Sequence, residues 1–417
     1  MEAIEFLFLD LNAYFASVEQ QLTPALRGKP VAVVPVDTDA TCAIAVSYEA
    51  KPYGIHTGTP VWEAKKRCPE LVCVVARHEA YVDYHHRVLQ EVDRHVPIHS
   101  VDSIDELSCK LLGKERETVY ALDLARRIKQ GLRERVGECI RASIGFSSNR
   151  FLAKIATDMR KPDGLLILTA DMLPHALHGY PLDTLPGIGR NMYRRLLMAG
   201  IGDMETLWMQ SPRQLRNLWG SVEGERFWYK LRGHELASAP AGEKRSIGHS
   251  HVLAPEWRGQ EQAWQVAERL LQKAAARLRR HQYYARCLRL SVRLETGHRF
   301  ALDIRLEAVC DTLTLSRALK ILWGQVMAQA GSGRVRKISV GLTMLCNHPQ
   351  RQEDLFTPAS AQEWRRRQER VSRSMDKLNA RYGRNTVTMG FLPGRSEGFS
   401  GTKVAFTRIP ETEEFFE

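Results

Sequence analysis

The sequence has no run of apolar residues approaching the length of about 18 that a membrane-spanning helix requires. Its start, Met1 to Glu5, carries acidic side chains where a secretory signal peptide needs basic ones, and the apolar run behind them is short. No internal repeat of roughly 20–50 residues is evident, which argues against a solenoid. We therefore expect a cytoplasmic protein with no membrane partner.

Cysteine is present, but not in a metal-binding pattern. The chain has no C-x-x-C pair, and no cysteine lies near a histidine at the spacing of zinc ligands. This argues against the common structural zinc sites and predicts reduced, buried thiols. The cysteines are Cys42, Cys68, Cys73, Cys109, Cys139, Cys287, Cys310 and Cys346.

The sequence does carry a large positive surplus. Its 417 residues suffice for roughly three or four domains, and 44% apolar with 26% charged residues is the balance of a folded globular protein. The formal net charge is +12 and the pI about 9.4. Such a surplus favours an anionic partner, nucleic acid first and a membrane surface second, with a merely solvated basic face as the alternative.

The first 165 residues alternate between strand and helix patterns. Residues 4–9 predict a buried strand that delivers Asp10 at its end, and residues 100–112 have the pattern of a β-hairpin. The β-α-β-β-α-β order predicts an α+β split sheet with helices on one face. The other predicted elements are helices over 12–20, 78–95 and 151–159, strands over 31–36 and 140–144, and a turn at 161–164.

From Leu182 onward, helical patterns alternate with glycine turns. The run Pro186-Gly187-Ile188-Gly189 leads into a helix, and a second glycine-bounded turn spans 220–224. Helix starts after such turns offer free backbone N–H groups that can each bind a phosphate. Gly187 and Gly189 are therefore candidate contacts to a nucleic-acid backbone, and an ordinary helix–helix connection is the alternative.

Beyond a predicted linker at 237–244, apolar and polar residues alternate along three segments, which predicts strands with one buried and one wet face. Residues 244–346 contain 18 lysines and arginines against 7 acidic residues, nearly the surplus of the whole chain. A basic sheet face suits phosphate contacts, whereas a solubilising face more often mixes both signs. The candidate DNA contacts on the wet face are Arg289, Arg293 and Lys337. The expected buried sets are Leu288, Leu290, Val292 and Leu294; Phe300, Leu302, Ile304 and Leu306; and Ile338, Val340, Leu342 and Met344.

Three carboxylates are candidates for a metal-dependent reaction, with ordinary solvated surface acids as the alternative. Joining a nucleotide to a strand builds charge on the attacking and leaving oxygens, and two Mg²⁺ ions can stabilise both. Such hard cations take oxygen ligands, chiefly carboxylates. Asp10 ends the first strand, and Asp105-Glu106 lies in the hairpin. Because adjacent strand residues point to opposite faces, Asp105 and Glu106 can reach one site only at a bend or bulge.

The context of these acids resembles the Y family of DNA polymerases. Asp10 to Glu19 is similar to the family's first catalytic motif, and Ser103-Ile104-Asp105-Glu106 to its S-I-D-E motif. Ser47-Tyr48-Glu49-Ala50-Lys51 resembles the fingers motif. Gly145 to Gly164 resembles the palm helix with its phosphate-binding lysine, and Pro186 to Gly189 the helix-hairpin-helix of the thumb. These motifs follow the family's order and spacing over roughly residues 4–345.

The resemblance implies a fold and a set of domains. The fold is α+β, a right-hand polymerase with a split βαβ palm, small fingers, a helical thumb with a helix-hairpin-helix, and a separate α/β little finger. The implied bounds are 1–12 with 77–165 for the palm, 13–76 for the fingers, 166–236 for the thumb, 244–346 for the little finger and 347–417 for a C-terminal tail.

The resemblance also implies roles for individual residues. Asp10, Asp105 and Glu106 would be catalytic and would hold two Mg²⁺ ions together with the carbonyl of Leu11. The deoxynucleotide triphosphate would meet the backbone near Tyr14 and Phe15 and the side chains of Tyr48, Lys51 and Lys161. Phe15 would be the steric gate that excludes a 2′-hydroxyl, with a plain core aromatic as the alternative.

Some positions depart from the family's commoner pattern. Asn12 stands where many members have Asp, and Lys51 where many have Arg, which is more like the UmuC branch than the DinB branch. Ala45 stands where several relatives have a threonine that touches the phosphates, so triphosphate binding could be weaker. Asp102 has no assigned role.

About 90 residues separate Asp10 from Asp105, too few for long closing fingers, and the chain leaves no room for a proofreading domain. We therefore expect error-prone synthesis across lesions.

The C-terminal tail carries a candidate partner site. Gln352-Glu353-Asp354-Leu355-Phe356 resembles the pentapeptide by which bacterial polymerases bind the sliding clamp, with Gln352, Asp354, Leu355 and Phe356 as the contacts. A basic helix is expected over 364–382, and 374–384 resembles the C-terminal extension of UmuC-type chains. The segment 406–410 is expected to dock on the body or on a partner, and mutagenesis accessory proteins are further candidate partners.

Two alternatives remain beside a template-directed, error-prone polymerase acting in DNA repair with primer-template DNA and deoxynucleotides. One is a non-catalytic, clamp-binding scaffold of a mutagenesis complex, which loss of the metal acids would mark. The other is a template-restricted nucleotidyl transferase of the same family.

Overall fold

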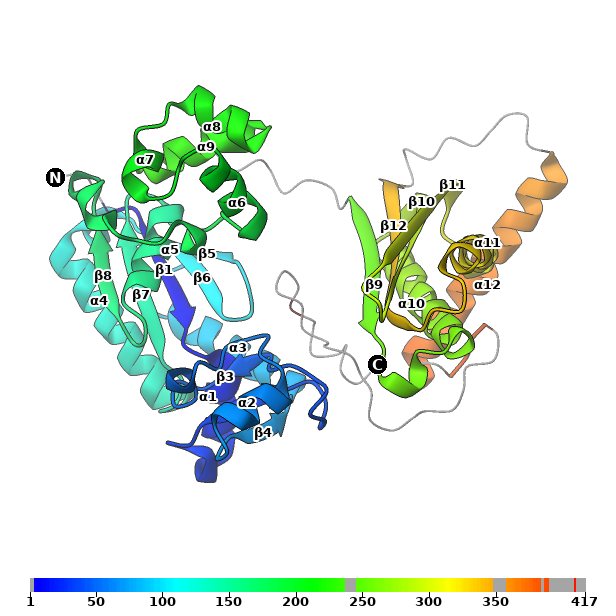
Figure 1. Ribbon diagram of the computed structural model, residues 1–417, viewed down its shortest axis with the longest axis horizontal. Coiled ribbons are helices and arrows are strands. Elements are labelled where there is room, and N and C mark those ends of the chain that lie inside the picture. The colour runs from blue at the N-terminus through cyan, green and yellow to red at the C-terminus, as the bar shows by residue number, and fades with distance from the viewer. Residues whose placement is uncertain (1–3, 237–244, 348–357, 384–385, 390–408, 410–417) are drawn as a thin grey trace. The chain divides into compact units, whose positions relative to one another are not determined.

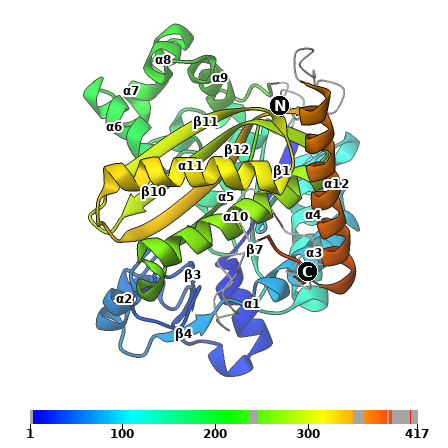
Figure 2. The same ribbon diagram turned by 90° about the vertical axis from the view of Figure 1, so that its right-hand side faces the viewer.

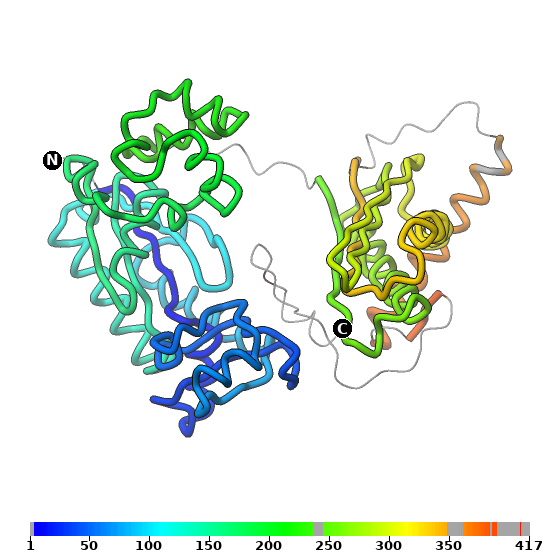
Figure 3. Tube along the Cα trace, in the orientation of Figure 1, coloured from blue at the N-terminus to red at the C-terminus, as the bar shows by residue number. Residues whose placement is uncertain are grey.

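The computed structural model describes residues 4–236, 245–347, 358–383, 386–389 and 409. The chain forms two compact units, one of Met1–Ser238 with Thr402–Phe415 and one of Ala239–Gly401 with Phe416–Glu417. Figures 1 and 2 show the chain as a ribbon from two directions, and Figure 3 traces its path. Each unit is described by itself.

A five-stranded sheet forms the centre of the first unit. Its order is β5-β6-β1-β7-β8, with β1 antiparallel to both of its neighbours and β7 parallel to β8. Every residue of β1 is buried. The strands are β1 (Phe6–Leu11), β5 (Ile98–Val101), β6 (Glu106–Lys110), β7 (Ala142–Ser147) and β8 (Leu165–Leu168).

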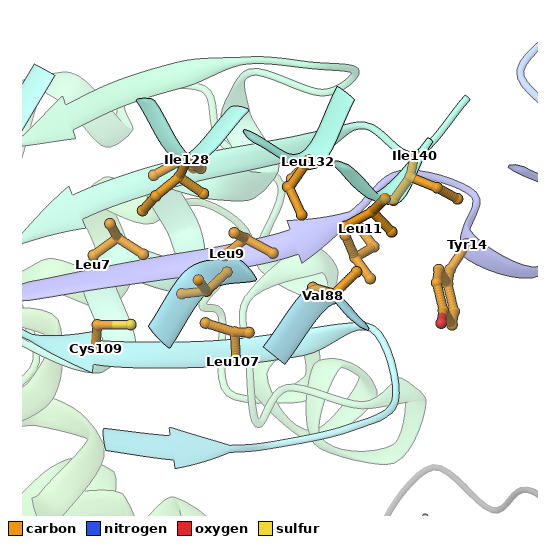
Figure 4. Close-up of a cluster of buried hydrophobic side chains, with 14 of the residues drawn as sticks. Leu7, Leu9, Leu11, Tyr14, Val88, Leu107, Cys109, Ile128, Leu132 and Ile140 are labelled. Carbon is orange, nitrogen blue, oxygen red and sulfur yellow. The ribbon is translucent and has the colours of Figure 1, made fainter. Parts of the chain in front are cut away.

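Helices cover both faces of this sheet, so the prediction of helices on one face is wrong. Leu7 and Leu9 pack in one core with α3 (His78–Asp93) and α4 (Thr118–Gly131), as Figure 4 shows. Phe6 and Phe8 point the other way and pack against Ala153 of α5 (Arg150–Met159). The cause lies in β1 itself: both of its faces are apolar, and each needs cover. Ile409 also packs against the first core.

A small sheet of order β3-β2-β4 follows β1 in the chain. Its core contains Ala32, Ile55, Ala64 and Leu71. The elements are α1 (Tyr14–Leu22), β2 (Val31–Val34), β3 (Ala45–Val46), η2 (Lys51–Tyr53), α2 (Val61–Arg67) and β4 (Val72–Val75).

A group of short helices completes the first unit and packs on α5. Asn149 caps α5 through its side-chain oxygen, and its Nδ2 donates to the carbonyls of Lys230 and His234 at 2.7 and 3.1 Å. Gly224 lets two helices touch, since a Cβ there would lie 2.1 Å from the Leu215 carbonyl oxygen. The helices are α6 (Arg190–Met198), α7 (Met204–Trp208), α8 (Pro212–Trp219) and α9 (Val222–Leu231).

The second unit is a four-stranded antiparallel sheet of order β11-β10-β12-β9. Two helices, α10 and α11, lie along one face of it (Figure 2), and their apolar residues share one core with the inward side chains of the strands. The elements are β9 (Ser246–Val252), α10 (Gln260–Arg280), β10 (Tyr283–Leu294), β11 (Arg299–Val309), α11 (Thr312–Ala330), β12 (Val335–Asn347) and α12 (Ala359–Tyr382).

Helix α12 confirms the basic helix expected over 364–382, and polar contacts attach it to the other helices of the unit. The Arg279 guanidinium bonds both oxygens of Asp376 at 2.6 and 2.8 Å. The Ser372 hydroxyl, fully buried, accepts from the Thr312 backbone N–H at 3.1 Å.

The expected burial pattern holds for β10 and fails in part elsewhere. Leu288, Leu290 and Val292 are fully buried. Met344 was expected on the buried face but is 55% exposed, because its φ of 53° interrupts the pleat of β12. The apolar side chains of β11 between Phe300 and Leu306 are only half-buried, since β11 is an edge strand.

The cysteines are all free thiols, as expected. The prediction that they are buried is wrong for Cys42, which is exposed, and only half right for Cys73 and Cys139, which are half-buried. Within the ranges described above, no helix is both long and apolar enough to cross a membrane.

Candidate active site

Three carboxylates lie in the region where β1 and β6 run side by side. Asp10 pairs directly with Glu106 across the two strands, so both side chains lie on one face of the sheet. Asp105 lies in the bend just before β6, and its carbonyl accepts from the Leu11 N–H at 2.8 Å. The backbone N–H groups of Asp102 and Ser103 close this bend onto the Glu106 carbonyl. The bend that the sequence required beside Asp105 is therefore present.

Burial makes the charges of Asp10 and Asp105 unfavourable. The pKa of Asp10 is raised from 3.8 to about 7, chiefly by burial and further by the charges of Asp105 and Glu106, against the opposing effect of Lys161. Burial also raises the pKa of Asp105, with the Glu106 charge adding to it and a hydrogen bond from the Ser103 hydroxyl opposing it. The cluster is thus a site where added positive charge is stabilised.

Two lysines supply positive charge at this cluster. Lys161 Nζ lies 2.7 Å from Asp10 Oδ2 and 2.7 Å from Asp158 Oδ1. Lys154, on α5, bonds Glu106 through its Nζ. Burial acts to lower the pKa of Lys161, but the charges of Asp10 and Asp158 outweigh it and hold that pKa above its ordinary value. The family resemblance predicts that Lys161 binds the triphosphate and assigns no role to Lys154. In the structure, both lysines pair with the acids.

The donor set fits a divalent cation, although its side chains do not yet lie close enough together to hold one. Among the residues that the structure describes, no three His, Cys, Asp or Glu side chains converge closely enough to hold a metal as they stand. The available ligands are nevertheless carboxylate oxygens, which Mg²⁺ prefers. The ammonium group of Lys161 lies against Asp10. A bound cation would compensate the same negative charge of Asp10.

An aromatic stack borders the start of α1. The Phe15 ring lies parallel to the ring of Tyr81, with centroids 4.2 Å apart and 13° between the planes. The Tyr81 hydroxyl donates to Glu19 Oε1 at 2.7 Å, and Arg77 pairs with the same buried carboxylate. Phe15 is half-buried and packs against the first core. Tyr14 is buried, and its hydroxyl donates to the Tyr81 carbonyl at 2.6 Å, which leaves only its backbone for a ligand.

Tyr48 and Lys51 extend the positive charge. Lys51 Nζ lies 3.4 Å from the centre of the Tyr48 ring. Burial lowers the pKa of Lys51, and the charge of Lys161 lowers it further. Burial raises the pKa of Tyr48, while Lys161 opposes that rise. The charge of Lys161 acts on both Tyr48 and Lys51, and so does the charge of Asp10, so these groups lie near one another.

The glycine turn before α6 has the expected open geometry. Gly187 has a φ of 91°, a conformation that favours glycine, and Gly189 is the residue that caps α6. A Cβ built at either glycine meets no atom within 4 Å, so a phosphate could approach the backbone there. The first N–H groups of α6 have no partner within the helix.

The wet face of the second unit carries adjacent cations. Arg293 pairs across the sheet with Arg299 on β11 and with Lys337 on β12. Arg293 and Arg299 bond to neutral oxygens, the Gly297 carbonyl and the Ser291 hydroxyl. Arg289 differs, because its guanidinium bonds both oxygens of Asp303 at 2.7 and 2.6 Å.

Known proteins match this chain along most of its length. Residues 9–158 match the impB/mucB/samB family, and residues 244–355 match the C-terminal domain of that family. DNA polymerase IV of Moorella thermoacetica is 33% identical over 391 residues, covering 91% of this chain and 94% of that protein. DNA polymerase IV 1 of Bacillus subtilis is 29% identical over 393 residues, covering 92% and 91%.

Solved structures show the same fold. A Y-family DNA polymerase chimera of Dbh and Dpo4 superposes with a TM-score of 0.70 at 23% identity, covering 82% of this chain and all of that one. An insertion ternary complex of Dbh DNA polymerase gives a TM-score of 0.53 at 23% identity over 82% of this chain and all of that one. The chain belongs to the Y family of DNA polymerases.

Membership of the Y family confirms the α+β right-hand fold and the polymerase activity expected from the sequence. The relatives named above are DNA polymerases IV, so the expected closeness to the UmuC branch stays a prediction. Residues 352–356, the candidate clamp-binding segment, lie outside the described residues.

Several residues of this Y-family site were missed by sequence reasoning. His85 is buried on α3, and its Nδ1 contacts the Ile104 carbonyl at 2.7 Å, which holds the bend that carries Asp105. Burial lowers the pKa of His85 to about 4, so the ring is neutral at pH 7 and its Nδ1–H donates. Asp102 accepts from Arg150 at 2.8 Å and so ties the bend to α5. The sequence offered no signal for these contacts. Separately, on the wet face of the second unit, the alternation along β11 could have pointed to Arg299.

Proposed function

We propose that this Y-family polymerase extends a DNA primer with deoxynucleotides across damaged template, with Asp10, Asp105 and Glu106 and the Leu11 carbonyl holding two Mg²⁺ ions. The observation that carries the proposal is the direct pairing of Asp10 with Glu106 beside the Asp105 bend, with Lys161 alongside. Bound there, the metal ions would stabilise charge on the attacking and leaving oxygens.

The chain's own residues bind and orient the nucleotide in this proposal. Lys161, Lys51 and Tyr48 supply two charges and a hydroxyl around one space, which suits a triphosphate. The first backbone N–H groups of α1, near Tyr14 and Phe15, provide further donors. The half-buried Phe15 ring lies under the sugar and excludes a 2′-hydroxyl.

The two units also support a proposed division into domains. We assign the five-stranded sheet to the palm (1–12 and 77–165), the small sheet to the fingers (13–76), the helical group to the thumb (166–236) and the second sheet to the little finger (244–346). Only α1, the small sheet, the seven-residue α2 and two three-residue 3-10 helices lie between β1 and the palm helix α3, which supports short fingers and an open site tolerant of distorted template.

Primer-template DNA is the proposed macromolecular partner. The open backbone at Gly187 and Gly189 and the row of Arg293, Arg299 and Lys337 suit phosphates. We further propose a cytoplasmic enzyme that binds the sliding clamp through 352–356, with mutagenesis accessory proteins as candidate partners of the tail.

A primer-extension assay with purified protein on undamaged and abasic templates tests the proposal. We expect Mg²⁺-dependent extension on both templates and none with Asp105→Ala. A clamp-binding scaffold would extend neither template, although it keeps its DNA affinity. A template-restricted transferase would insert one nucleotide regardless of the template base.

A further inference from the structure

One buried side chain links the segments that carry Asp10 and Lys161. Asn12 follows β1 and is 3% exposed. Its Oδ1 accepts from the backbone N–H of Asp163 at 2.6 Å. Asp163 lies in the turn that also carries Lys161, whose Nζ is 2.7 Å from Asp10 Oδ2.

Ser143 on β7 completes this link. Asn12 Nδ2 donates to the Ser143 hydroxyl oxygen at 3.0 Å, and that oxygen also accepts from the Gly164 backbone N–H at 3.3 Å. The Asn12–Ser143 pair therefore holds two successive N–H groups of the turn. Ser143 is fully buried, so removing the pair would leave buried donors without partners.

The backbone of Asn12 is equally constrained. Its N–H donates to the Arg141 carbonyl at 2.8 Å, and its carbonyl accepts from the Ser17 hydroxyl at 2.8 Å. Ser17 lies on α1, the helix whose start carries Tyr14 and Phe15. These two bonds fix the backbone of Asn12, and its side chain in turn holds the turn at Asp163 in place.

We propose that Asn12 is a positioning residue that sets the place of Lys161 relative to Asp10, so that the lysine can also reach the triphosphate of an incoming nucleotide. An amide suits this role because it offers an acceptor to the Asp163 N–H and a donor to Ser143 at the same time. The inference rests on the proposed function, in which Lys161 binds the triphosphate.

The variant Asn12→Leu tests the inference, because leucine has similar size and no polar atom. We measure the equilibrium Kd of the correct deoxynucleotide on a primer-template with a dideoxy-terminated primer, and separately kcat for extension. Loss of a buried hydrogen-bond partner should raise Kd by about tenfold. The fall in kcat should be smaller, because the acids themselves are untouched.

Thr157→Val is the matched control. The Thr157 hydroxyl is buried and donates to the carbonyls of Phe8 on β1 and Ala153 on α5, at 3.2 and 2.8 Å. Loss of this hydroxyl removes a buried hydrogen bond to the same sheet but no hydrogen bond of the turn that carries Lys161. Thermal melting compares the folding of both variants. Kd should stay at the wild-type value in Thr157→Val, and an equal rise in both variants would overturn the inference.

A double-mutant cycle with Lys161→Ala separates positioning from general damage. If Asn12 acts through Lys161, adding Asn12→Leu to Lys161→Ala should raise Kd by less than about twofold. A full tenfold rise in that background would refute the positioning role. If Asn12→Leu alone leaves Kd unchanged while Lys161→Ala raises it, only this inference fails. If Lys161→Ala itself leaves Kd unchanged, the proposed role of Lys161 fails with it.

Discussion

Lys161 and Asp10 form a direct ion pair, 2.7 Å from Nζ to Oδ2, although they are 151 residues apart in the chain. The lysine therefore compensates one of the acids that we assign to the metal ions. Binding of a nucleotide with its metal ions would supply both a new cation for Asp10 and a new anion for Lys161, so the pair can separate without leaving either charge unpaired.

Removing either acid next to the bend should abolish extension. We expect Asp105→Ala and Glu106→Gln each to reduce the extension rate by more than a hundredfold while the Kd for primer-template DNA stays within about twofold. Glutamine at 106 keeps an oxygen for Lys154, so the contact with α5 is preserved. Asp123→Ala, at an exposed acid of α4, is the control. Extension within tenfold of the wild-type rate would contradict the assignment.

Truncating Phe15 should admit ribonucleotides. Phe15→Ala removes the ring that lies on Tyr81 and opens the space that we assign to the sugar. The ratio of kcat/KM for deoxy- over ribonucleotide should fall by at least about tenfold, equal to roughly 1.4 kcal/mol. The measurement is single-nucleotide insertion with each substrate on one template. An unchanged ratio would leave Phe15 as a core aromatic only.

The basic wet face of the second unit should determine the salt dependence of DNA binding. Arg289→Ala with Arg293→Ala should flatten the log–log slope of affinity against salt by up to about two units, at ~0.9 per phosphate contact. Arg293 should account for the larger part, because Arg289 is held by Asp303. Sequence preference should not change. Lys320→Ala, exposed on α11 on the other side of the sheet, should leave the slope unaltered. If the double variant keeps the wild-type slope, this face does not meet DNA.

Asp10 should make the metal-free protein less stable as pH rises. Its pKa is raised to about 7 in the fold from 3.8, so between these values the folded chain holds a proton that the unfolded chain has lost. The free energy of unfolding therefore falls as pH rises through this window. Asp10→Asn stays neutral, and with chelator present it should exceed the wild type at pH 8 by on the order of 2–4 kcal/mol, with no difference below pH 4.

Denaturant unfolding of both proteins between pH 4 and pH 8 measures this effect. The opposite order at pH 8, with the wild type more stable, would mean that the pairing with Lys161 outweighs the burial of Asp10.

Local patterns predicted much of the fold and of the site. The run 4–9 predicted the strand that carries Asp10, and alternation predicted β10 with Leu288 and Leu290 inside, because both signals lie in a few neighbouring residues. The contacts of Asn12 with Asp163 and of His85 with Ile104 could not be predicted, since they depend on where distant segments meet.

Two corrections have the same origin in tertiary structure. The cover of Phe6 and Phe8 by α5 follows from the packing of a whole helix, and the exposure of Met344 from a single backbone angle in β12. The apolar run of β1 indicates that both faces need cover, but it does not indicate which helix covers them, and the alternation along β12 does not indicate a change in one backbone angle.

The register of Asp10 with Glu106 limits which changes of chain length the protein can tolerate. Leu9 pairs with Leu107 and Asp10 with Glu106, so the two acids share a face only in this alignment. Inserting or deleting one residue at the start of β6 would turn Glu106 toward the core side and bring a leucine to the acids. Length variation among natural relatives should therefore be rare between 101 and 107 and commoner in exposed connections such as 36–41, where the chain crosses no sheet.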